Sequence, residues 1–123
     1  METLQELRAW KDDPEFVENW RQVKRENKKK LAKLTYELTG IIIPIDSLYD
    51  VMVKRMHEYK RQLMNIFYVI HRYFMIKDMP ANERANVVPR VVLIGGKAAP
   101  GYYNAKAVIK LINHVGAVVN NDA

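Results

Sequence analysis

The sequence has 123 residues, a net charge of +6 and no cysteine, which leaves room for one small domain and excludes disulfides and thiolate metal sites. Its hydrophobic fraction of 49% and charged fraction of 28% are typical of a soluble globular protein. No apolar run approaches the roughly 20 residues that a membrane-spanning helix needs, so we expect no membrane partner.

The amino-terminal segment METLQELRAW lacks the basic-then-apolar layout of a secretory signal peptide. The absence of cysteine also fits a reducing compartment. We therefore expect a cytoplasmic protein.

The excess of positive charge suggests an anionic partner. Many of the cations lie close together, at Lys24, Arg25, Lys28, Lys29, Lys30 and Lys33. Acidic residues are interleaved with them, at Glu15, Glu18, Glu26 and Glu37. This mixture is typical of a solvated helix face and does not favour a nucleic-acid partner. A small basic module for nucleic acid or phosphate-bearing ligands remains the alternative, and duplex binding with a steep salt dependence would support it.

The first elements in chain order are helical. Leu4 to Trp10 has the pattern of a short helix. Asp13 and Pro14 then form a helix start, with Asp13 as the cap and Pro14 in the first turn. Apolar residues recur from there at helical spacing, at Phe16, Trp20, Val23, Leu31, Leu34 and Leu38. Gly40 is the predicted end of this amphipathic helix, whose apolar stripe needs a partner.

The middle of the chain changes from extended to helical. Residues 41–45 are β-branched but contain a proline, which predicts a short extended piece or an edge strand. Residues 49–55 are expected to be mostly extended. Residues 57–77 are apolar around well over half of a helix, which indicates a helix buried inside a larger structure. Met79-Pro80 ends that helix, and residues 81–86 are predicted to be a loop.

The last third predicts a strand–helix–strand unit. Residues 87–94 hold a continuous apolar strand of the kind found in parallel sheets, and Gly95-Gly96 ends it. A helix is expected from about Tyr102 to His114, with Gly116 as its stop and residues 117–119 as the start of a second strand. Such a unit needs further parallel neighbours, so we expect the chain to be a piece of a larger α/β protein.

The sequence contains few recognisable catalytic motifs. No GxSxG, HExxH or Walker loop is present, and His57, His71 and His114 are too widely spaced to pair as metal ligands. Gly95-Gly96-Lys97 is a weak phosphate-loop signal, and a plain tight strand-to-helix turn is the favoured interpretation. The densest stretch is residues 53–62, where five of ten residues are basic or histidine. Its cations could bind an anion at a helix start, although solvated cations are the simpler interpretation.

Two long blocks resemble one enzyme family. The segment VKRMHEYKRQLMN, residues 53–65, closely resembles the VKRIHEYKRQ signature of the glycogen and starch phosphorylases. The block PRVVLIGGKAAPGYYNAKAVIKLINHVGAVVNND, residues 89–122, resembles the strand and glycine turn that open the family's C-terminal nucleotide-binding-like domain. The segment PEFVENWRQVKRENKKKLAKLTYELTG, residues 14–40, is similar to the helix that precedes the signature. The resemblance covers nearly all of this chain but a minor part of a full-length member.

The resemblance implies a fold and an organisation. The chain would be an internal fragment of a two-domain α/β enzyme of the glycosyltransferase-B type, with helices followed by the start of a Rossmann-like parallel sheet. Residues 1–48 would be a helical segment from the amino-terminal half or the junction between domains. Residues 49–86 would hold the phosphate-binding signature and a buried helix. Residues 87–123 would begin the C-terminal domain, and the parent enzyme would be a homodimer.

The resemblance also implies roles for individual residues. Arg55, Lys60 and His57 would belong to the catalytic site, with His57 holding the site together. Lys54 would contact the phosphate of the cofactor, and Lys60 would contact both that phosphate and the substrate phosphate. Arg55 would bind the substrate phosphate and Tyr59 a sugar hydroxyl.

Residues outside this group receive lesser roles. Tyr102 matches an aromatic residue that forms a site for flat aromatic ligands in some members, although packing explains a tyrosine there equally well. Lys97 is expected to be an ordinary turn or interface residue. Met52 and Met56 depart from the Gln and Ile of commoner members, and both changes are expected to be tolerated.

The implied reaction is phosphorolysis of an α-1,4-glucan by inorganic phosphate, which gives glucose 1-phosphate with retained configuration. The implied cofactor is pyridoxal 5'-phosphate, whose phosphate has an acid–base role. The lysine that forms the Schiff base with this cofactor lies downstream in the family, and no lysine of this chain matches it. We therefore expect the 123 residues alone to be inactive and marginally stable. A truncated gene product that acts at most as an interaction partner is a further alternative.

Overall fold

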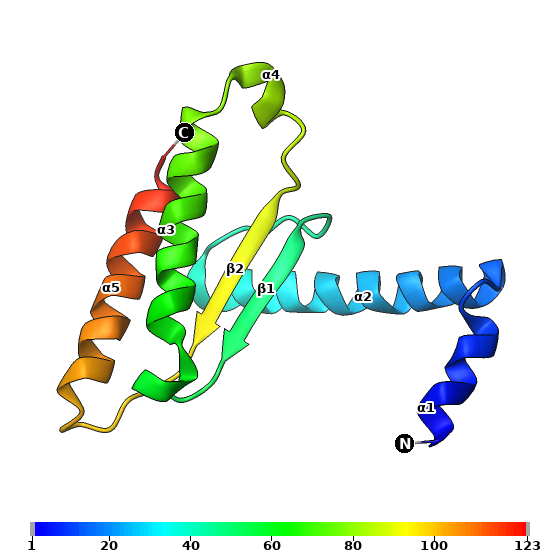
Figure 1. Ribbon diagram of the computed structural model, residues 1–123, viewed down its shortest axis with the longest axis horizontal. Helices are drawn as coiled ribbons and strands as arrows, with labels where there is room; N and C mark the ends of the chain where they lie inside the picture. The colour runs from blue at the N-terminus through cyan, green and yellow to red at the C-terminus, as the bar shows by residue number, and fades with distance from the viewer. Residues whose placement is uncertain (1, 123) are drawn as a thin grey trace. The chain divides into compact units, whose positions relative to one another are not determined.

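A computed structural model of the protein describes residues 2–122, whose elements fall into two units. The first unit ends at Asp46 and the second begins at Ser47. The first unit is helical, and the second combines helices with a two-stranded sheet (Figure 1). The chain is therefore a mixed α/β protein, as the sequence predicted.

In the first unit, helix α2 (Pro14–Thr39) has the ends that the sequence predicted. It follows α1 (Glu2–Glu6) and the short 3₁₀ helix η1 (Leu7–Trp10). The Phe16 N–H donates to Asp13 Oδ1 at 2.8 Å, which satisfies one of the free amides of the first turn. At the other end Gly40 has a φ of 73° and donates its N–H to the Tyr36 carbonyl, so a left-handed residue closes the helix.

The cations of α2 lie on a solvated face. Lys29 pairs with Glu26 at 2.6 Å and Lys33 with Glu37 at 3.7 Å, all with exposed side chains. Exposed pairs of this kind contribute little to stability, but they neutralise much of the positive charge locally. The sequence prediction of a solvated, mixed-charge helix face is confirmed.

The second unit is built on a parallel pair of strands. Strand β1 (Leu48–Val53) pairs with β2 (Arg90–Gly95) in a register that runs from Leu48 opposite Arg90 to Val53 opposite Gly95. The connection passes through the 3₁₀ turn η2 (Glu58–Lys60), helix α3 (Gln62–Asp78) and the short helix α4 (Ala81–Arg84). Parallel strands need such a helical crossover because their adjacent ends lie at opposite edges of the sheet.

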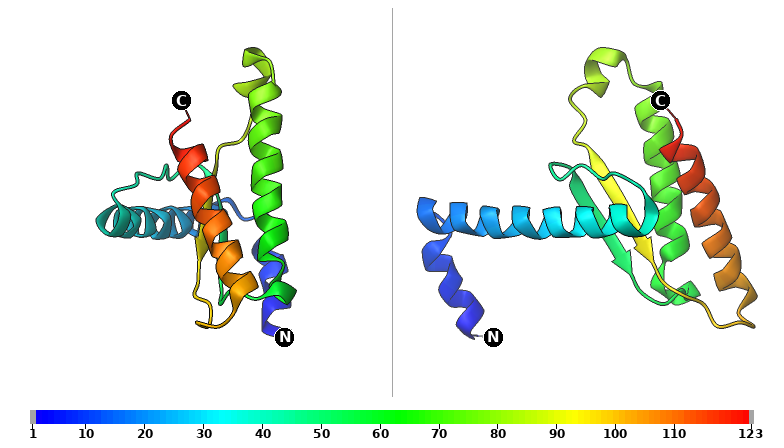
Figure 2. Two further views of the ribbon diagram at one scale, coloured as in Figure 1. Left: turned by 90° about the vertical axis from the view of Figure 1, so that its left-hand side faces the viewer. Right: turned by 180° about the vertical axis from the view of Figure 1, so that it is seen from behind.

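Helices α3 and α5 (Tyr103–Asn120) lie side by side beside the strands. Their amino-terminal ends lie near the carboxyl ends of β1 and β2, as Figures 1 and 2 show. On the sheet, Arg90 pairs with Asp50 at 3.0 Å, and its guanidinium lies 5.5 Å from the ring centroid of Tyr68 in α3. These contacts join α3 to the strands.

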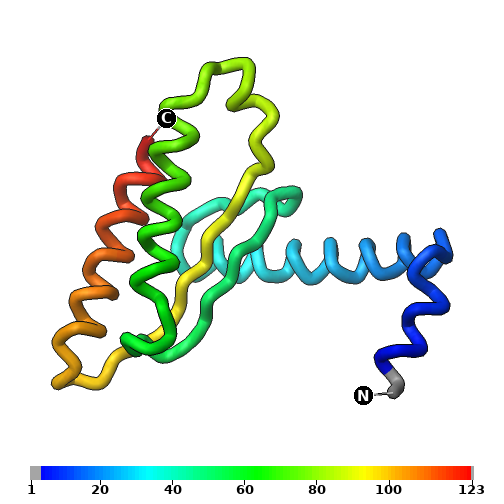
Figure 3. The backbone as a smooth tube through the Cα atoms, in the orientation of Figure 1, coloured from blue at the N-terminus to red at the C-terminus, as the bar shows by residue number. Residues whose placement is uncertain are grey.

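The sequence predicted a short extended piece or an edge strand at residues 41–45, and these residues form no strand, which leaves the extended piece. Three other boundaries predicted from the sequence were wrong. Strand β2 begins at Arg90 and not at residue 87. Helix α3 begins at Gln62 and not at residue 57, because Arg61 adopts a left-handed conformation with φ 58° that separates it from η2. Residues 81–84, predicted to be a loop, form α4, and the backbone trace in Figure 3 shows this turn between α3 and β2.

The largest correction concerns the end of the chain. Helix α5 continues through Gly116 to Asn120, so residues 117–119 are helical and do not begin a second strand. The apolar positions Leu111, Val115 and Val119 are spaced four residues apart and are all partly buried, so packing continues past the glycine. A glycine inside a helix costs about 1 kcal/mol relative to alanine, which packing of the following turn can offset. The strand–helix–strand unit of this chain is β1–α3–β2.

Buried apolar side chains are few in residues 2–122: Ile43, Met56, Ile66 and Ala105. Met64, Phe67 and Phe74 of α3 are 64%, 56% and 56% exposed, which confirms that this apolar helix lacks its full cover here. No helix within residues 2–122 combines the length and apolarity that crossing a bilayer requires.

Replacing Gly116 with Ala distinguishes the observed helix from the predicted stop. No atom lies within 4 Å of a Cβ built at Gly116, so Gly116→Ala should raise the free energy of unfolding of the second unit by about 0.5–1 kcal/mol. The measurement is urea denaturation followed by circular dichroism.

The matched control is Gly40→Ala. Because Gly40 has a φ of 73°, alanine there should destabilise α2 by about 1 kcal/mol. Destabilisation of the second unit by Gly116→Ala would show that α5 does not continue through this residue.

Candidate functional site

The candidate site lies where β1 and β2 end. Val53 and Gly95 are the last paired residues of the two strands, so residues 54–57 and residues 96–102 emerge at the same edge of the sheet. Ligands of open parallel sheets bind at this carboxyl edge. The dense basic stretch that the sequence indicated is therefore in the place where the fold favours a binding site (Figure 1).

The backbone after β1 is held against the backbone after β2. The Lys54 N–H donates to the Gly95 carbonyl at 2.9 Å, and the Met56 N–H donates to the Lys97 carbonyl at 3.1 Å. Met56 is 5% exposed, so it anchors the segment while the neighbouring Lys54 and Arg55 side chains are exposed. The bonding pattern of the sheet thus extends into the loop.

This close pairing requires a glycine at position 96. A Cβ on Gly96 would lie 2.1 Å from the Lys54 carbonyl oxygen, a distance that no side chain tolerates. The sequence favoured a tight turn over a phosphate loop at Gly95-Gly96-Lys97. The structure shows that Gly96 allows the two loops to approach each other.

The four cations of the signature lack anionic partners within residues 2–122. Lys54, Arg55, Lys60 and Arg61 form no salt bridge there. Lys60 Nζ lies 5.6 Å from the ring centroid of Tyr59, a cation–π distance, and Tyr59 itself is 72% exposed. The site therefore carries positive charge that nothing in the described part of the chain neutralises.

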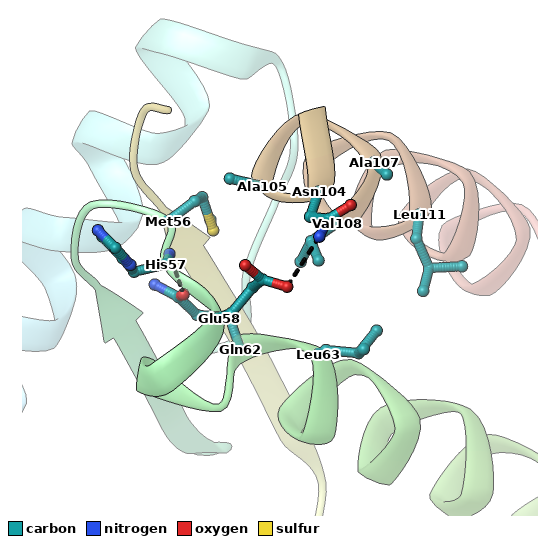
Figure 4. Close-up of a pocket in the computed structure, with 10 residues that line it drawn as sticks. All are labelled: Met56, His57, Glu58, Gln62, Leu63, Asn104, Ala105, Ala107, Val108 and Leu111. Atoms are coloured by element: carbon teal, nitrogen blue, oxygen red, sulfur yellow. Dashed lines mark hydrogen bonds between the residues drawn. The ribbon is translucent and has the colours of Figure 1, made fainter. Parts of the chain in front are cut away.

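The one carboxylate inside the signature, Glu58, is occupied by other contacts. Tyr102 Oη donates to Glu58 Oε2 and Asn104 Nδ2 donates to Glu58 Oε1, each at 2.8 Å. Figure 4 shows the Glu58 carboxylate directed at Asn104. The hydrogen bond from Tyr102, and then that from Asn104, lower the pKa of Glu58 below its ordinary value of 4.5. This latch joins η2 to the start of α5 and keeps the carboxylate from pairing with the neighbouring cations.

The aromatic residues of the site form one group. The His57 ring centroid lies 4.6 Å from that of Tyr59 and 5.1 Å from that of Tyr102, with the Tyr102 ring edge-on at 71°. His57 Nδ1 is 3.4 Å from Tyr102 Oη. The structure therefore brings together His57, Tyr59 and Tyr102, which the sequence singled out from two separate motifs.

A cavity of about 460 Å³ opens between η2 and α5 (Figure 4). One wall comes from Met56, His57, Glu58, Gln62 and Leu63, and the other from Asn104, Ala105, Ala107, Val108 and Leu111. The walls are mostly apolar, with polar groups gathered at the Glu58 end. The cavity lies on the α5 side of the loop that carries the exposed cations.

The two methionines that depart from the family signature are accommodated. Met52 Sδ accepts a hydrogen bond from Asn65 Nδ2 at 3.6 Å, so the sulfur retains a polar contact to α3. Met56 is buried, where an apolar side chain of similar volume is tolerated. Lys97 contributes its carbonyl group to the loop pairing and has an exposed side chain, as expected for a turn residue.

Sequence reasoning missed the importance of Glu58, Asn104 and Gln62. Glu58 and Gln62 lie within the signature, but the signature does not show what they bond to. Tyr102, which bonds to Glu58, is 44 residues away in the sequence. Gln62 is 2% exposed and bonds to the backbone of residues 54–57. A polar residue at the start of an apolar helix was the only available signal.

Comparisons with known proteins agree on one family. Residues 1–123 match the family model described as Phosphorylase: Carbohydrate phosphorylase. The chain is 50% identical over 123 residues to an alpha-glucan phosphorylase, H isozyme, from Triticum aestivum. The aligned region spans 100% of this chain and 15% of that relative. It is 48% identical over 122 residues to alpha-glucan phosphorylase 2, cytosolic, from Arabidopsis thaliana, covering 99% of this chain and 14% of the relative.

A bacterial relative shows the same pattern. The chain is 49% identical over 122 residues to a glycogen phosphorylase from Synechocystis, covering 99% of this chain and 14% of that relative. The chain thus spans about one seventh of the length of these relatives.

Replacing Tyr102 with Phe tests the latch through pH. Because the Tyr102 hydrogen bond is the largest cause that lowers the pKa of Glu58, Tyr102→Phe should raise this pKa toward 4.5. In the wild-type chain a lowered folded-state pKa stabilises the second unit above pH 4.5, and this contribution is lost as the pH falls through the folded-state value. Titration of the Glu58 side-chain carbon by NMR measures the change.

Tyr103→Phe is the control, because Tyr103 is the adjacent tyrosine and is 80% exposed. It should leave the Glu58 titration unchanged. An equal effect of the two substitutions would contradict the latch.

Proposed function

Because the chain belongs to the carbohydrate phosphorylase family, we propose that it provides the phosphate-binding segment of an α-glucan phosphorylase. The parent enzyme would transfer glucosyl units from the ends of an α-1,4-glucan to inorganic phosphate and release glucose 1-phosphate. The names of the relatives, which act on α-glucan or glycogen, support this substrate class.

The observation that carries the proposal is the unneutralised charge at the end of β1. Lys54, Arg55 and Lys60 form no salt bridge within residues 2–122, while the nearby Glu58 is held by Tyr102 and Asn104. Cations that remain unpaired in the protein favour an anionic ligand. A phosphate group matches this charge and its place at the carboxyl edge of a parallel sheet.

We assign the individual roles by family resemblance and by position. Arg55 and Lys60 bind and orient the substrate phosphate, and Tyr59, which is 72% exposed, contacts a sugar hydroxyl. His57 contacts the rings of Tyr59 and Tyr102, which suits a residue that holds the site together. Tyr102 would border any site for flat aromatic ligands, in addition to its hydrogen bond with Glu58.

The same residues fit the cofactor that the family uses, pyridoxal 5'-phosphate. Lys54 is exposed and Lys60 partly exposed, and neither pairs with a carboxylate in the described residues, so both are free to contact a second phosphate. When bound, the cofactor supplies an acid–base function through its phosphate group. Lys54 and Lys60 would fix the position of that group next to the substrate phosphate.

The proposed site holds two phosphates close together, that of the cofactor and that of the substrate, and several cations are needed to offset their repulsion. Two like unit charges about 4 Å apart repel by roughly 4 kcal/mol at an effective dielectric constant of 20. Three cations on one short segment offset this repulsion and orient the attacking phosphate. Their backbone is fixed on one side by the bonds to Gly95 and Lys97, which limits reorganisation when the anions bind.

We further propose the organisation of the parent enzyme. In a two-domain enzyme of the glycosyltransferase-B type, residues 49–86 would hold the phosphate-binding signature and a buried helix, and residues 87–123 would begin the C-terminal Rossmann-like domain. Residues 1–48 would be a helical segment from the amino-terminal half or the junction between domains. The parent would be a cytoplasmic homodimer. The exposed apolar side chains of α3 support a larger assembly around this segment.

Neutralising the cations tests the proposal in a chimera. The chimera is the wheat relative in which these 123 residues replace the matching segment, with which they share 50% identity. Arg55→Gln and Lys60→Gln should each lower kcat/KM for phosphorolysis by about 100-fold or more, since each removes an interaction that stabilises transition-state charge. Rates of glucose 1-phosphate release at varied phosphate concentration provide the measurement.

Lys110→Gln, at an exposed position of α5, is the matched control and should change the rate less than twofold, roughly the effect of a surface substitution. Full turnover of a double variant at Arg55 and Lys60 would show that these cations do not bind the reacting phosphate.

The isolated 123-residue chain should not catalyse phosphorolysis, because no lysine in it matches the family's cofactor lysine. Incubation of the purified chain with glycogen, phosphate and pyridoxal phosphate should give no glucose 1-phosphate above the blank. Phosphate-dependent release of glucose 1-phosphate by the 123-residue chain alone would show that catalysis does not need the cofactor lysine of the family.

A further inference from the structure

The buried side chain of Gln62 bonds to the backbone of the cationic segment. Gln62 is the first residue of α3 and is 2% exposed. Its Oε1 accepts from the His57 N–H at 2.9 Å, and its Nε2 donates to the Arg55 carbonyl at 3.0 Å. Nε2 also lies 3.5 Å from the Lys54 carbonyl oxygen. Figure 4 shows Gln62 beneath His57 at the start of the helix.

These bonds reproduce the pattern of a parallel sheet around Met56. In a parallel ladder, one residue donates to the carbonyl before its partner residue and accepts from the N–H after it. The Gln62 carboxamide does this with the Arg55 carbonyl and the His57 N–H, on either side of Met56. The Met56 N–H itself bonds to the Lys97 carbonyl. The Gln62 carboxamide therefore pairs with one side of the Met56 backbone, while the loop after β2 pairs with the other side through Lys97.

Arg61, the residue before Gln62, adopts an energetically costly backbone conformation, and α3 begins directly after it. Arg61 has a φ of 58° and is the one non-glycine residue with positive φ among residues 2–122. Such a conformation costs of order 1–3 kcal/mol and persists only when the surrounding structure enforces it. Here it separates η2 from α3. The position of Gln62 at the start of α3 therefore coincides with a strained backbone at Arg61, which the surrounding structure must stabilise.

We infer that Gln62 is a positioning residue of the phosphate site: it fixes residues 54–57 so that Lys54 and Arg55 are held toward a bound phosphate. This inference rests on the proposed function. Gln62 does not contact the anion in this arrangement and acts through the backbone of its neighbours. Without its carboxamide, the carbonyl of Arg55 and the N–H of His57 lose these partners, and the cations gain conformational freedom that phosphate binding must then remove.

A purely structural role for Gln62 predicts a different outcome. General destabilisation lowers the active fraction of the enzyme, and therefore its apparent kcat, without changing the KM for phosphate. A positioning role raises the KM for phosphate and leaves the KM for the glucan unchanged. The two KM values measured on one enzyme distinguish these cases.

The kinetic test compares Gln62→Met, Arg55→Gln and the control Asn113→Ala in the chimera. Methionine keeps the length of the side chain and removes both bonding atoms. Asn113 is an exposed amide whose Nδ2 donates to the Ile109 carbonyl of its own helix at 2.9 Å. Gln62→Met should raise the KM for inorganic phosphate about tenfold, the equivalent of one or two net hydrogen bonds, with the KM for the glucan unchanged and no effect of Asn113→Ala.

The outcomes separate the inference from the proposed function. If Arg55→Gln raises the KM for phosphate and Gln62→Met does not, the inference about Gln62 is wrong and the proposed function stands. If Arg55→Gln also leaves this KM unchanged, the proposed function is wrong and the inference falls with it. If Gln62→Met does not fold, Gln62→Glu decides by the same criterion, since it keeps the acceptor for His57 and loses the donor to Arg55.

Amide hydrogen exchange in the 123-residue chain provides an independent measurement. Gln62→Met should accelerate exchange at His57 about tenfold or more, because the His57 N–H loses its acceptor, whereas Gln62→Glu should keep its protection. Unchanged exchange at His57 in Gln62→Met would overturn the inference by removing its geometric basis.

Discussion

The parallel register of β1 and β2 is the constraint on which the site depends. Because Val53 pairs with Gly95, the loops after both strands leave the sheet at one edge, and the backbone of residues 54–56 continues to pair with residues 95–97. This pairing is possible because position 96 has no side chain: a Cβ there would lie 2.1 Å from the Lys54 carbonyl oxygen. A register shift of one residue would separate the basic signature from the glycine turn.

Hydrogen bonds, and not only the order of charged residues, determine which charges of the signature are paired. Glu58 lies between the cations in the chain, where it would be expected to neutralise them. Its carboxylate is instead held by Tyr102 and Asn104, so the cations remain available for anions from outside. The same contacts join the signature to α5. The bonds of Glu58 to Tyr102 and Asn104 therefore keep its carboxylate away from the cations and also hold η2 against α5.

The core of the described residues is thin. Aromatic and methionine side chains of α3 are more than half exposed, although their helical periodicity indicates burial. The relatives are about seven times as long as the chain, and in them a larger polypeptide is available to cover such surfaces. Binding to that polypeptide would stabilise the second unit beyond what its own few buried residues provide.

The sequence by itself determined the features that depend on neighbouring residues. Asp13, Pro14 and Gly40 set the ends of α2 because caps act over one turn, and the apolar run of residues 91–94 marked β2. The cationic signature and its family resemblance were also legible from the order of residues. The tertiary structure alone decided the continuation of α5 through Gly116, the pairing of β1 with β2, and the contacts of Glu58 and Gln62. The bond of Glu58 to Tyr102 joins residues 44 positions apart. The bonds of Gln62 span only 5 and 7 positions, but they depend on how its side chain is packed, which local propensity does not encode.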